Sequence, residues 1–441
     1  MIKLRLGCPS LVCQLLVVGC AALMMRASSL ALAEKPTPQK TLLVDSLPYG
    51  SQAIDYHSTE TDDAVSRLAR RLKAGDLTLG KESRGGYLRP LLAAMGVPLE
   101  SQLLVFSKTA LHPRLVGPEN PRALYFNDEV SVAWVPGAEV LEIASIDPKK
   151  GALFYTLKQT TDAKPQLQRE TRCLACHVNR DTFEVPGLVV RSFITDHQGN
   201  PKQGLTRVTH ETGLSKRWAG WYLSGAPRAF AHLGNRTQTE PGTQRLAETL
   251  QHTGSPHLEI VAETSRYLTG DSDIVAHLVF HHQCHGQNLL IRVGYEARLG
   301  RPSDALEQLL RYLLFVHETP LPVSIGETSR FADWFARQGQ QDAEGRSLRQ
   351  FDLKQRLFKY RLSYLIETRI FDQLPPATKR RFYDRLWEIL SGQDRSDDFR
   401  HLPRPERQAI IEILRATKTD LPEAWFRPVA GECLPLARQP S

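Results

Sequence analysis

The spacing of hydrophobic residues changes twice along the chain. Near the N-terminus, Val65, Leu68 and Leu72 recur at helical intervals, which predicts a helix over 61–74, and a second helix is expected over 88–95. After about residue 100 the apolar residues form short runs, and after about residue 270 the helical spacing returns.

The short runs in the middle of the chain have the character of β-strands. They are rich in β-branched and aromatic residues and are separated by turn signals such as Asn127-Asp128 and Asp147-Pro148. We expect strands over 103–106, 123–126, 130–135, 140–146, 152–157 and 188–195. This pattern predicts a small antiparallel sheet.

The last part of the chain has helical spacing. A long helix begins near the candidate cap Asp271–Asp273, with Gly286 as its weak point, and the further helices are expected over 304–318, 329–337, 356–374, 376–390 and 404–417. The predicted fold class is therefore α+β and helix-rich, with a small antiparallel β region followed by a C-terminal α-helical bundle. The expected regions are an N-terminal helical arm (34–100), a β-rich region (101–265) and an α-helical region (266–441).

Residues 1–33 have the features of an export signal. Two basic residues precede an apolar run over 11–25, and Ala31-Leu32-Ala33 suits signal peptidase. The run is shorter than the roughly 20 residues of a spanning helix. We therefore expect a periplasmic or otherwise exported protein. Two alternatives stay open. The segment could be an uncleaved membrane anchor, or the protein could carry a lipid anchor at Cys20, because Val17-Val18-Gly19-Cys20 resembles a bacterial lipobox.

Composition and charge exclude several classes of protein. The chain has 441 residues, of which 41% are hydrophobic, with 56 Lys and Arg against 48 Asp and Glu, which is ordinary for a globular protein. Removal of residues 1–33, which hold three basic and no acidic residues, would lower the net charge from +8 to +5. No dense basic run interleaved with aromatic residues occurs, so nucleic acid is not an expected partner.

One motif carries specific chemistry. Cys173-Leu174-Ala175-Cys176-His177 has the pattern that attaches a c-type haem. Cysteines three apart lie on one side of a helical turn and can form thioethers to both vinyl groups of one porphyrin, while the adjacent histidine reaches the iron. The residue frequencies of this chain give about 0.0035 such pentapeptides by chance. The sequence therefore predicts one covalently attached haem c.

Other uses of this cysteine pair are a redox-active disulfide or a zinc site. The first is typical of a thioredoxin-like strand-to-helix setting, and the second needs another cysteine pair. Cys284 and Cys433 are isolated from each other by 149 residues, although they could form a disulfide in an oxidising compartment. Haem attachment occurs outside the bacterial cytoplasm, which agrees with the export signal.

Several further segments support a family resemblance that covers most of the chain after the signal. The chain resembles an uncharacterised family of exported bacterial proteins with a single cytochrome c haem motif. The segments that carry the resemblance are Ala123–Asp128, Leu141–Ala144, Phe154–Leu157, Cys173–His177, Val185-Pro186-Gly187, Val190–Ser192, Arg217–Gly225, Asp273–Ala276, His282-Gln283, Gln287-Asn288 and Leu414–Thr417. The resemblance implies that Cys173 and Cys176 carry the haem and that His177 is the proximal iron ligand. This sequence departs from the family pattern around His281, Cys284 and His285, which puts any role of these three residues in doubt.

The second axial ligand separates electron carriers from haems that bind a substrate or a gas. Methionine is disfavoured, because Met95 is the only one left after signal removal and it precedes the motif. His277, His281 and His285 recur every four residues on the expected helix, and a polar stripe on that helix is their alternative reading. The candidate distal ligands are His282, from the family-like His282-Gln283 pair, and then His232.

These features predict an electron-transfer protein with a redox partner protein rather than an enzyme, and the resemblance adds no activity. The alternatives are a peroxidase-like haem enzyme or small-ligand sensor with an open distal site, and a partner-binding module stabilised by its haem. Arg191 and Arg217 could pair with the haem propionates, because a guanidinium binds carboxylates through two hydrogen bonds. The oligomeric state does not follow from the sequence.

Overall fold

The computed structural model describes residues 48–427 except for 160–164, 228, 238–263 and 302–303. The expected signal at 1–33, its alternative anchor Cys20, and Cys433 therefore lie outside the described residues. The described residues all belong to one compact unit.

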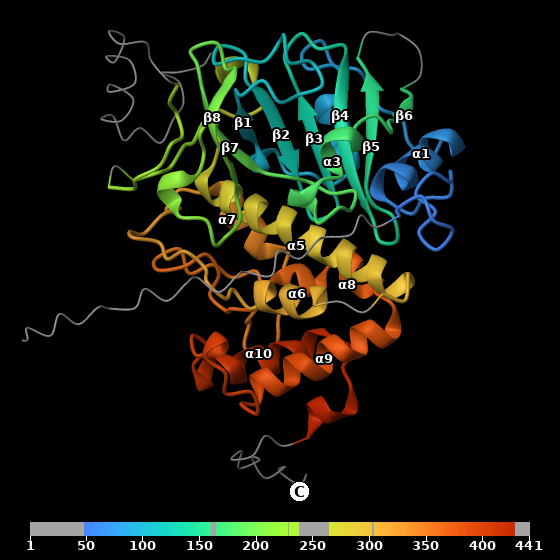
Figure 1. The fold of residues 1–441 in the computed structure, drawn as a ribbon. Coiled ribbons are helices and arrows are strands. Elements are labelled where there is room, and N and C mark those ends of the chain that lie inside the picture. Colours follow the sequence, from blue (N-terminus) through green and yellow to red (C-terminus); the bar gives the residue numbers. More distant parts are fainter. Residues whose placement is uncertain (1–47, 160–164, 228, 238–263, 302–303, 428–441) are drawn as a thin grey trace, which may run out of the picture. The chain divides into compact units, whose positions relative to one another are not determined.

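A six-stranded antiparallel sheet, in which strands that follow one another along the chain are also paired, occupies the middle of the sequence (Figure 1). Its strands are β1 (Leu103–Val105), β2 (Arg122–Phe126), β3 (Val130–Trp134), β4 (Val140–Asp147), β5 (Gly151–Lys158) and β6 (Leu167–Arg169). The first five match the expected runs to within one residue at each end. Strand β6 was not expected, because Leu167 is the sole apolar residue among its three.

A separate two-stranded sheet pairs β7 (Arg191–Thr195) with β8 (Pro201–Arg207). The first strand begins three residues later than expected. The second was not expected, because it begins at a proline and contains Gly204, and both residues are uncommon inside strands.

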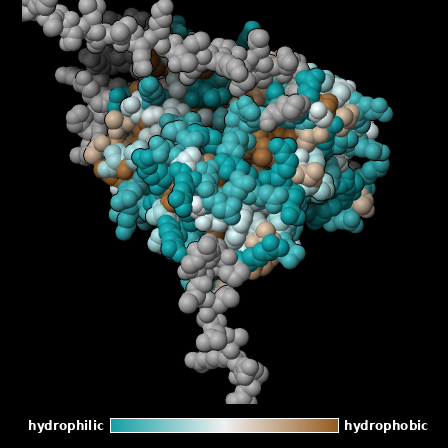
Figure 2. Space-filling view, turned by 60° about the horizontal axis from the view of Figure 1, so that its bottom comes forward, coloured by the Kyte–Doolittle hydropathy of each residue, from teal (hydrophilic) through white to brown (hydrophobic). Residues whose placement is uncertain are grey.

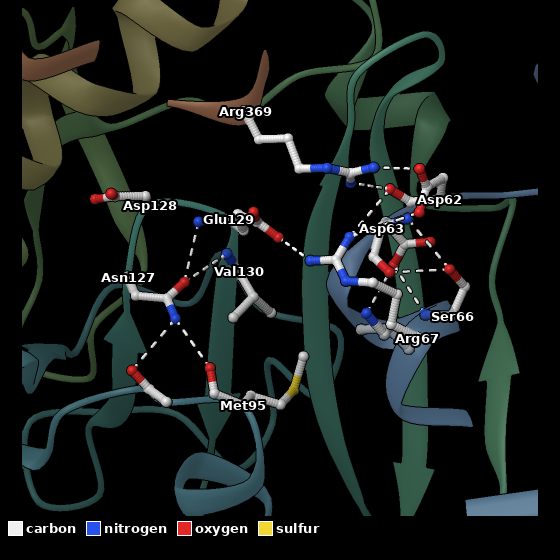
Figure 3. Close-up of polar contacts among 12 residues, drawn as sticks. Asp62, Asp63, Ser66, Arg67, Met95, Asn127, Asp128, Glu129, Val130 and Arg369 are labelled. Carbon is white, nitrogen blue, oxygen red and sulfur yellow. Dashed lines mark hydrogen bonds and ion pairs between the residues drawn. The ribbon is translucent and has the colours of Figure 1, made fainter. Parts of the chain in front are cut away.

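The turn between β2 and β3 is fixed by the side chain of Asn127 (Figure 3). Its Oδ1 accepts hydrogen bonds of 3.0 Å from the N–H groups of Glu129 and Val130, and its Nδ2 donates to the Met95 carbonyl. Asparagine favours turns because its short side chain can bind the backbone just ahead of it. The turn signal at Asn127-Asp128 is therefore confirmed.

Helix α1 (Ala64–Ala74) begins where Asp63 caps it, three residues after the expected start. The Asp63 carboxylate accepts hydrogen bonds from two backbone N–H groups of the first turn, and Ser66 Oγ accepts one in return from the Asp63 N–H. Arg67 of this helix pairs with Glu129 in the β2–β3 turn, which docks the helix on the sheet (Figure 3). The next helix is α2 (Leu88–Ala94).

The C-terminal part is helical, as expected, although the helix expected over 304–318 ends at Leu313. Its helices are α5 (Ile274–Arg298), α6 (Ala305–Leu313), α7 (Arg330–Arg337), α8 (Arg369–Asp372), α9 (Pro376–Leu390) and α10 (Arg404–Thr417). Helix α5 lies between the six-stranded sheet and α6, and α9 and α10 pack beyond α6 (Figure 1). A side chain at Gly286 would overlap Leu365, so the glycine allows close packing there. This arrangement confirms the mixed α+β class with C-terminal helices.

The prediction of a single helix over 356–374 is wrong. This stretch has only short helical turns, at Tyr364–Glu367 and α8. Asp352 Oδ1 accepts hydrogen bonds from three successive backbone N–H groups, at residues 354–356, and so forms a turn where the helix was expected to begin. Most apolar side chains between 357 and 366 are buried. Their dense spacing reflects a chain that crosses the core rather than one face of a helix.

The outer face of the C-terminal helices is polar. Figure 2 brings this part forward and shows a mostly hydrophilic surface with hydrophobic residues in small, scattered spots. Helix α9 buries Phe382 and Leu386, and α10 buries Ile410 and Leu414. Within the described ranges, no helix combines the length and the apolar character needed to cross a membrane.

Candidate haem-binding site

The cysteine motif forms one turn of helix, α3 (Leu174–His177), shortly after β6. The N–H groups of Cys176 and His177 both donate to the Cys173 carbonyl, at 3.1 and 3.0 Å. Leu174 is buried in the core, whereas Cys173 is half-buried and Cys176 is exposed. Both cysteines line the same cavity as His177, so the structure brings the three predicted haem-binding residues together.

A backbone carbonyl fixes the orientation of the His177 ring. His177 Nδ1 lies 2.9 Å from the Gly187 carbonyl oxygen, which can only accept, so Nδ1 carries the proton and Nε2 carries the free lone pair. Burial lowers the pKa of His177, and nearby Arg122 and Arg191 lower it further. The imidazole is thus held neutral with Nε2 available, as an iron ligand requires.

The segment Val185-Pro186-Gly187 supplies this carbonyl and is held from two sides. The Pro186 carbonyl accepts from Ala152 of β5 at 2.9 Å, and the Gly187 N–H donates to the His177 carbonyl at 3.0 Å. A side chain at position 187 would overlap the Asn288 side chain of α5. Asn288 also accepts from the Leu188 N–H and donates to the Leu188 carbonyl, at 3.0 and 2.7 Å. The sequence drew attention to Val185-Pro186-Gly187 and Gln287-Asn288, but it did not reveal that together they position the carbonyl that orients His177.

A cavity of about 460 Å³ separates the motif from one face of the six-stranded sheet. The strands β3 and β4 contribute small side chains to it, namely Ser131, Ala133 and Ala144, and larger apolar side chains complete the lining, among them Leu124, Phe154, Phe193, Trp221 and Phe280. Small residues on the sheet leave space for a flat group, and the large apolar side chains offer it the hydrophobic contacts that are usual in cofactor pockets. The residues present therefore fit a haem.

Two polar side chains of this lining form a pair that the sequence did not reveal. Arg122 Nη1 of β2 lies 3.3 Å from Glu142 Oε2 of β4, and the Leu111 N–H donates to Glu142 Oε1 at 3.2 Å. The Arg122 Nε is buried and has no hydrogen-bond partner among the described residues. The two residues lie 20 positions apart, and their contact depends on the pairing of three strands.

The two arginines considered as propionate partners have different places. Arg191 lines the cavity, where its Nε and Nη2 donate to Asp181 Oδ2 at 3.0 and 2.7 Å. Arg217 lies outside the lining and donates to the carbonyls of Thr212 and His210.

The candidate distal ligands do not line the cavity. His282 Nδ1 lies 2.9 Å from His210 Nδ1, and its Nε2 lies 2.7 Å from Ser363 Oγ, while burial lowers the pKa of His282 to about 3. His232 Nδ1 accepts from the Gly234 N–H at 3.0 Å, and burial lowers the pKa of His232 to about 4. In the described part of the lining, His177 is the sole histidine and methionine is absent.

Of the histidines at positions 277, 281 and 285 on α5, His277 and His281 contact each other, with ring centroids 5.8 Å apart, and both contact Trp218, whereas His285 has other neighbours. His277 Nε2 lies within 3.0 Å of Ser272 Oγ and the Tyr222 carbonyl, His281 packs on Trp218, and His285 contacts Phe183 and Tyr312. No cluster of three or more His, Cys, Asp or Glu suited to a metal ion occurs among the described residues. Cys284 is buried, and the pKa of its thiol is raised by burial; its disulfide with Cys433 stays a prediction.

Comparison with known proteins adds no relative. No family model matches the chain, and no match is found among curated proteins or solved structures. The family resemblance drawn from the sequence thus stays a prediction, and the residues of the site carry the functional argument.

Proposed function

We propose that the chain is an exported c-type haem protein with one haem, attached to Cys173 and Cys176 and coordinated by His177. The observation that carries the proposal is the hydrogen bond from His177 Nδ1 to the Gly187 carbonyl beside two thiols that line one cavity. This contact selects the tautomer that leaves Nε2 for a metal. When bound, the haem supplies a redox-active iron.

We further propose that the protein transfers electrons to or from a redox partner protein. The exposed Cys176 and half-buried Cys173 support this function, because they would bring the attached edge of the haem close to the surface. Phe154, whose ring centroid lies 4.6 Å from that of His177, packs against the proposed ligand. Together with the hydrogen bond to Gly187, this contact holds one orientation of the histidine ring.

Export is part of the proposal, because the thioethers of c-type haem form outside the bacterial cytoplasm. The signal at 1–33 supports a periplasmic or otherwise exported protein, and lipidation at Cys20 is the alternative that would tether it to the membrane. Mass spectrometry of the N-terminus of the exported chain distinguishes cleavage after Ala33 from a lipid on Cys20.

A second function is favoured by the composition of the lining. Among the described lining residues, none besides His177 is a histidine or a methionine, the usual protein ligands for the sixth iron position. An iron with a free sixth position can bind a small molecule, as in a peroxidase-like enzyme or a ligand sensor. This function and electron transfer make opposite predictions for carbon monoxide.

The test begins with export of the chain in cells that carry haem-maturation machinery. We expect a pyridine haemochrome spectrum of one haem c per chain, and no covalent haem in the double variant Cys173→Ala/Cys176→Ala. Absence of covalent haem in the wild type would refute the proposal. Carbon monoxide is then added to the reduced protein. An unchanged low-spin spectrum indicates two protein ligands and a dedicated electron carrier, whereas a prompt spectral shift indicates an open iron.

A further inference from the structure

The pair of Arg122 and Glu142 lies inside the haem-binding cavity and has no role in holding the motif. The side chains are 16% and 21% exposed. Arg122 is on β2 and Glu142 is on β4, with β3 between them, where Ala133 stands opposite Glu142. The small methyl group of Ala133 leaves room for the long arginine side chain to reach across the intervening strand.

The hydrogen bonds of this pair are unevenly satisfied. Glu142 accepts from two donors, Arg122 and the Leu111 N–H, one on each carboxylate oxygen. Arg122 makes one bond of 3.3 Å, and its buried Nε has no partner in the described part of the chain. A buried N–H of a charged group without an acceptor is costly and rare, and a bound ligand is one common explanation.

The pair also lines the same cavity as the proposed iron ligand, His177. Arg191, the other arginine of the lining, already donates two hydrogen bonds to Asp181. Of these two arginines, Arg122 is the one with a buried N–H that has no acceptor among the described residues, and a guanidinium prefers an anionic acceptor.

We propose that Arg122 binds a small inorganic anion beside the haem iron and that Glu142 positions the guanidinium for it. The proposal rests on the second function above, a haem with an open sixth position. A ferric iron and a nearby guanidinium would both attract an anion, in a cavity whose apolar walls strengthen the interaction. A neutral ligand such as carbon monoxide would gain little from the guanidinium.

The test measures anion and gas affinity in the same holoproteins. Azide and fluoride are titrated into the ferric form and carbon monoxide into the ferrous form, each followed by absorption. For Arg122→Leu we expect azide and fluoride affinities at least about tenfold weaker, because a hydrogen bond to a charged group is lost, with carbon monoxide affinity changed less than about twofold. Arg122→Lys, which keeps the charge, and Glu142→Gln, which keeps one acceptor, should lie between the wild type and Arg122→Leu.

A matched control is Arg292→Leu. Arg292 is also 16% exposed and pairs with a glutamate, Glu296, but on α5 and outside the lining. Its anion affinities should equal those of the wild type. Equal weakening in both leucine variants, or in anion and carbon monoxide binding alike, would overturn the proposal as a general charge or folding effect. If Arg122→Leu fails to fold, the uncharged pair Arg122→Gln/Glu142→Gln replaces it.

Two further outcomes are decisive. If the wild-type ferric protein binds one covalent haem but neither anion, the sixth position is filled, and the inference fails while the haem proposal stands. If Arg122→Leu shifts the reduction potential and leaves anion affinity unchanged, Arg122 holds a haem propionate instead, which also overturns the inference. Absence of haem in the pyridine haemochrome assay would instead defeat the proposed function itself.

Discussion

Replacement of Gly187 by alanine tests how the proposed proximal histidine is held. The added carbon would lie 2.9 Å from Asn288 Cγ and 3.2 Å from Thr182 Cβ, closer than side chains normally pack. Asn288 cannot simply turn away, because its amide makes hydrogen bonds of 3.0 and 2.7 Å to the backbone of Leu188. Either this side chain or the backbone of the loop must therefore move.

The two responses have similar costs but different consequences. Loss of the two Asn288 hydrogen bonds costs about 0.5–1.5 kcal/mol each, and a backbone shift in an overpacked core costs about 1–3 kcal/mol. We expect Gly187→Ala to lower the free energy of unfolding of the holoprotein by about 1–3 kcal/mol. A backbone shift would also weaken the contact between the Gly187 carbonyl and His177 Nδ1, which would change the basicity of the ligand and hence the reduction potential.

The assay is denaturant unfolding of four ferric holoproteins: the wild type, Gly187→Ala, Asn288→Ala and the double variant. Because Asn288→Ala removes the overlapping atoms, the double variant should be more stable than the sum of the single effects by at least about 0.5 kcal/mol. Strictly additive effects would refute the reasoning. Gly213→Ala is the control, since a side chain there meets nothing within 4 Å and should change stability by less than about 0.5 kcal/mol.

Three other predictions concern the scaffold. Gly286→Ala should lower the melting temperature measured by circular dichroism, because the new methyl group overlaps Leu365 and overpacking costs about 1–3 kcal/mol; an unchanged melting temperature would contradict the close packing of α5. Asp63→Ala should cost about 0.5–2 kcal/mol in denaturant unfolding through loss of the α1 cap, and about 1–3 kcal/mol more because the buried Tyr155 hydroxyl loses its acceptor; Asp63→Asn, which keeps the cap acceptor, should recover the first part. Stability should also fall as the pH drops from about 6.5 toward 3, because unfolded histidines bind protons that buried ones do not, by up to about 1.4 kcal/mol per pH unit for each histidine. Burial lowers to about 3 the pKa values of His277, His282 and His285. His282→Gln should therefore reduce the pH dependence of the free energy of unfolding by the equivalent of about one proton across this range. An unchanged pH dependence would refute this prediction.

Elements whose signals are local could be predicted from the sequence. The Asp273 cap, which accepts from the N–H groups of Val275 and Ala276, marks the start of α5, and the β2–β3 turn follows from Asn127. The prediction of a helix over 356–374 was wrong because a helix and a buried irregular segment can have the same density of apolar residues. Only the packing of that stretch against the other helices distinguishes the two.

The residues of the candidate site likewise separate into those that a local motif reveals and those that only the folded chain brings together. The Cys-x-x-Cys-His motif is local, so the sequence alone is enough to propose Cys173, Cys176 and His177 as haem-binding residues. Contacts between distant residues could not be predicted, since Asn288 meets the loop at Gly187 about a hundred positions earlier, and Arg122 meets Glu142 across a third strand. For the same reason helical periodicity placed His282 on α5 but could not show that its ring nitrogens face His210 and Ser363 instead of the cavity.

Helix α5 binds both the six-stranded sheet and the loop that orients His177. It is buried almost all round, yet three of its side chains are amides, and each donates to a backbone carbonyl of another segment: Gln283 to Asn127, Gln287 to Asp128 and Asn288 to Leu188. The first two carbonyls belong to the β2–β3 turn of the sheet, and the third belongs to the loop that orients His177. Because one helix binds both, the distance between the sheet and the histidine loop is set by the helix itself. A change in that distance would break several buried hydrogen bonds at once, so we expect the proposed haem and its ligands to be held in a cavity of fixed width, without closure of the protein around them.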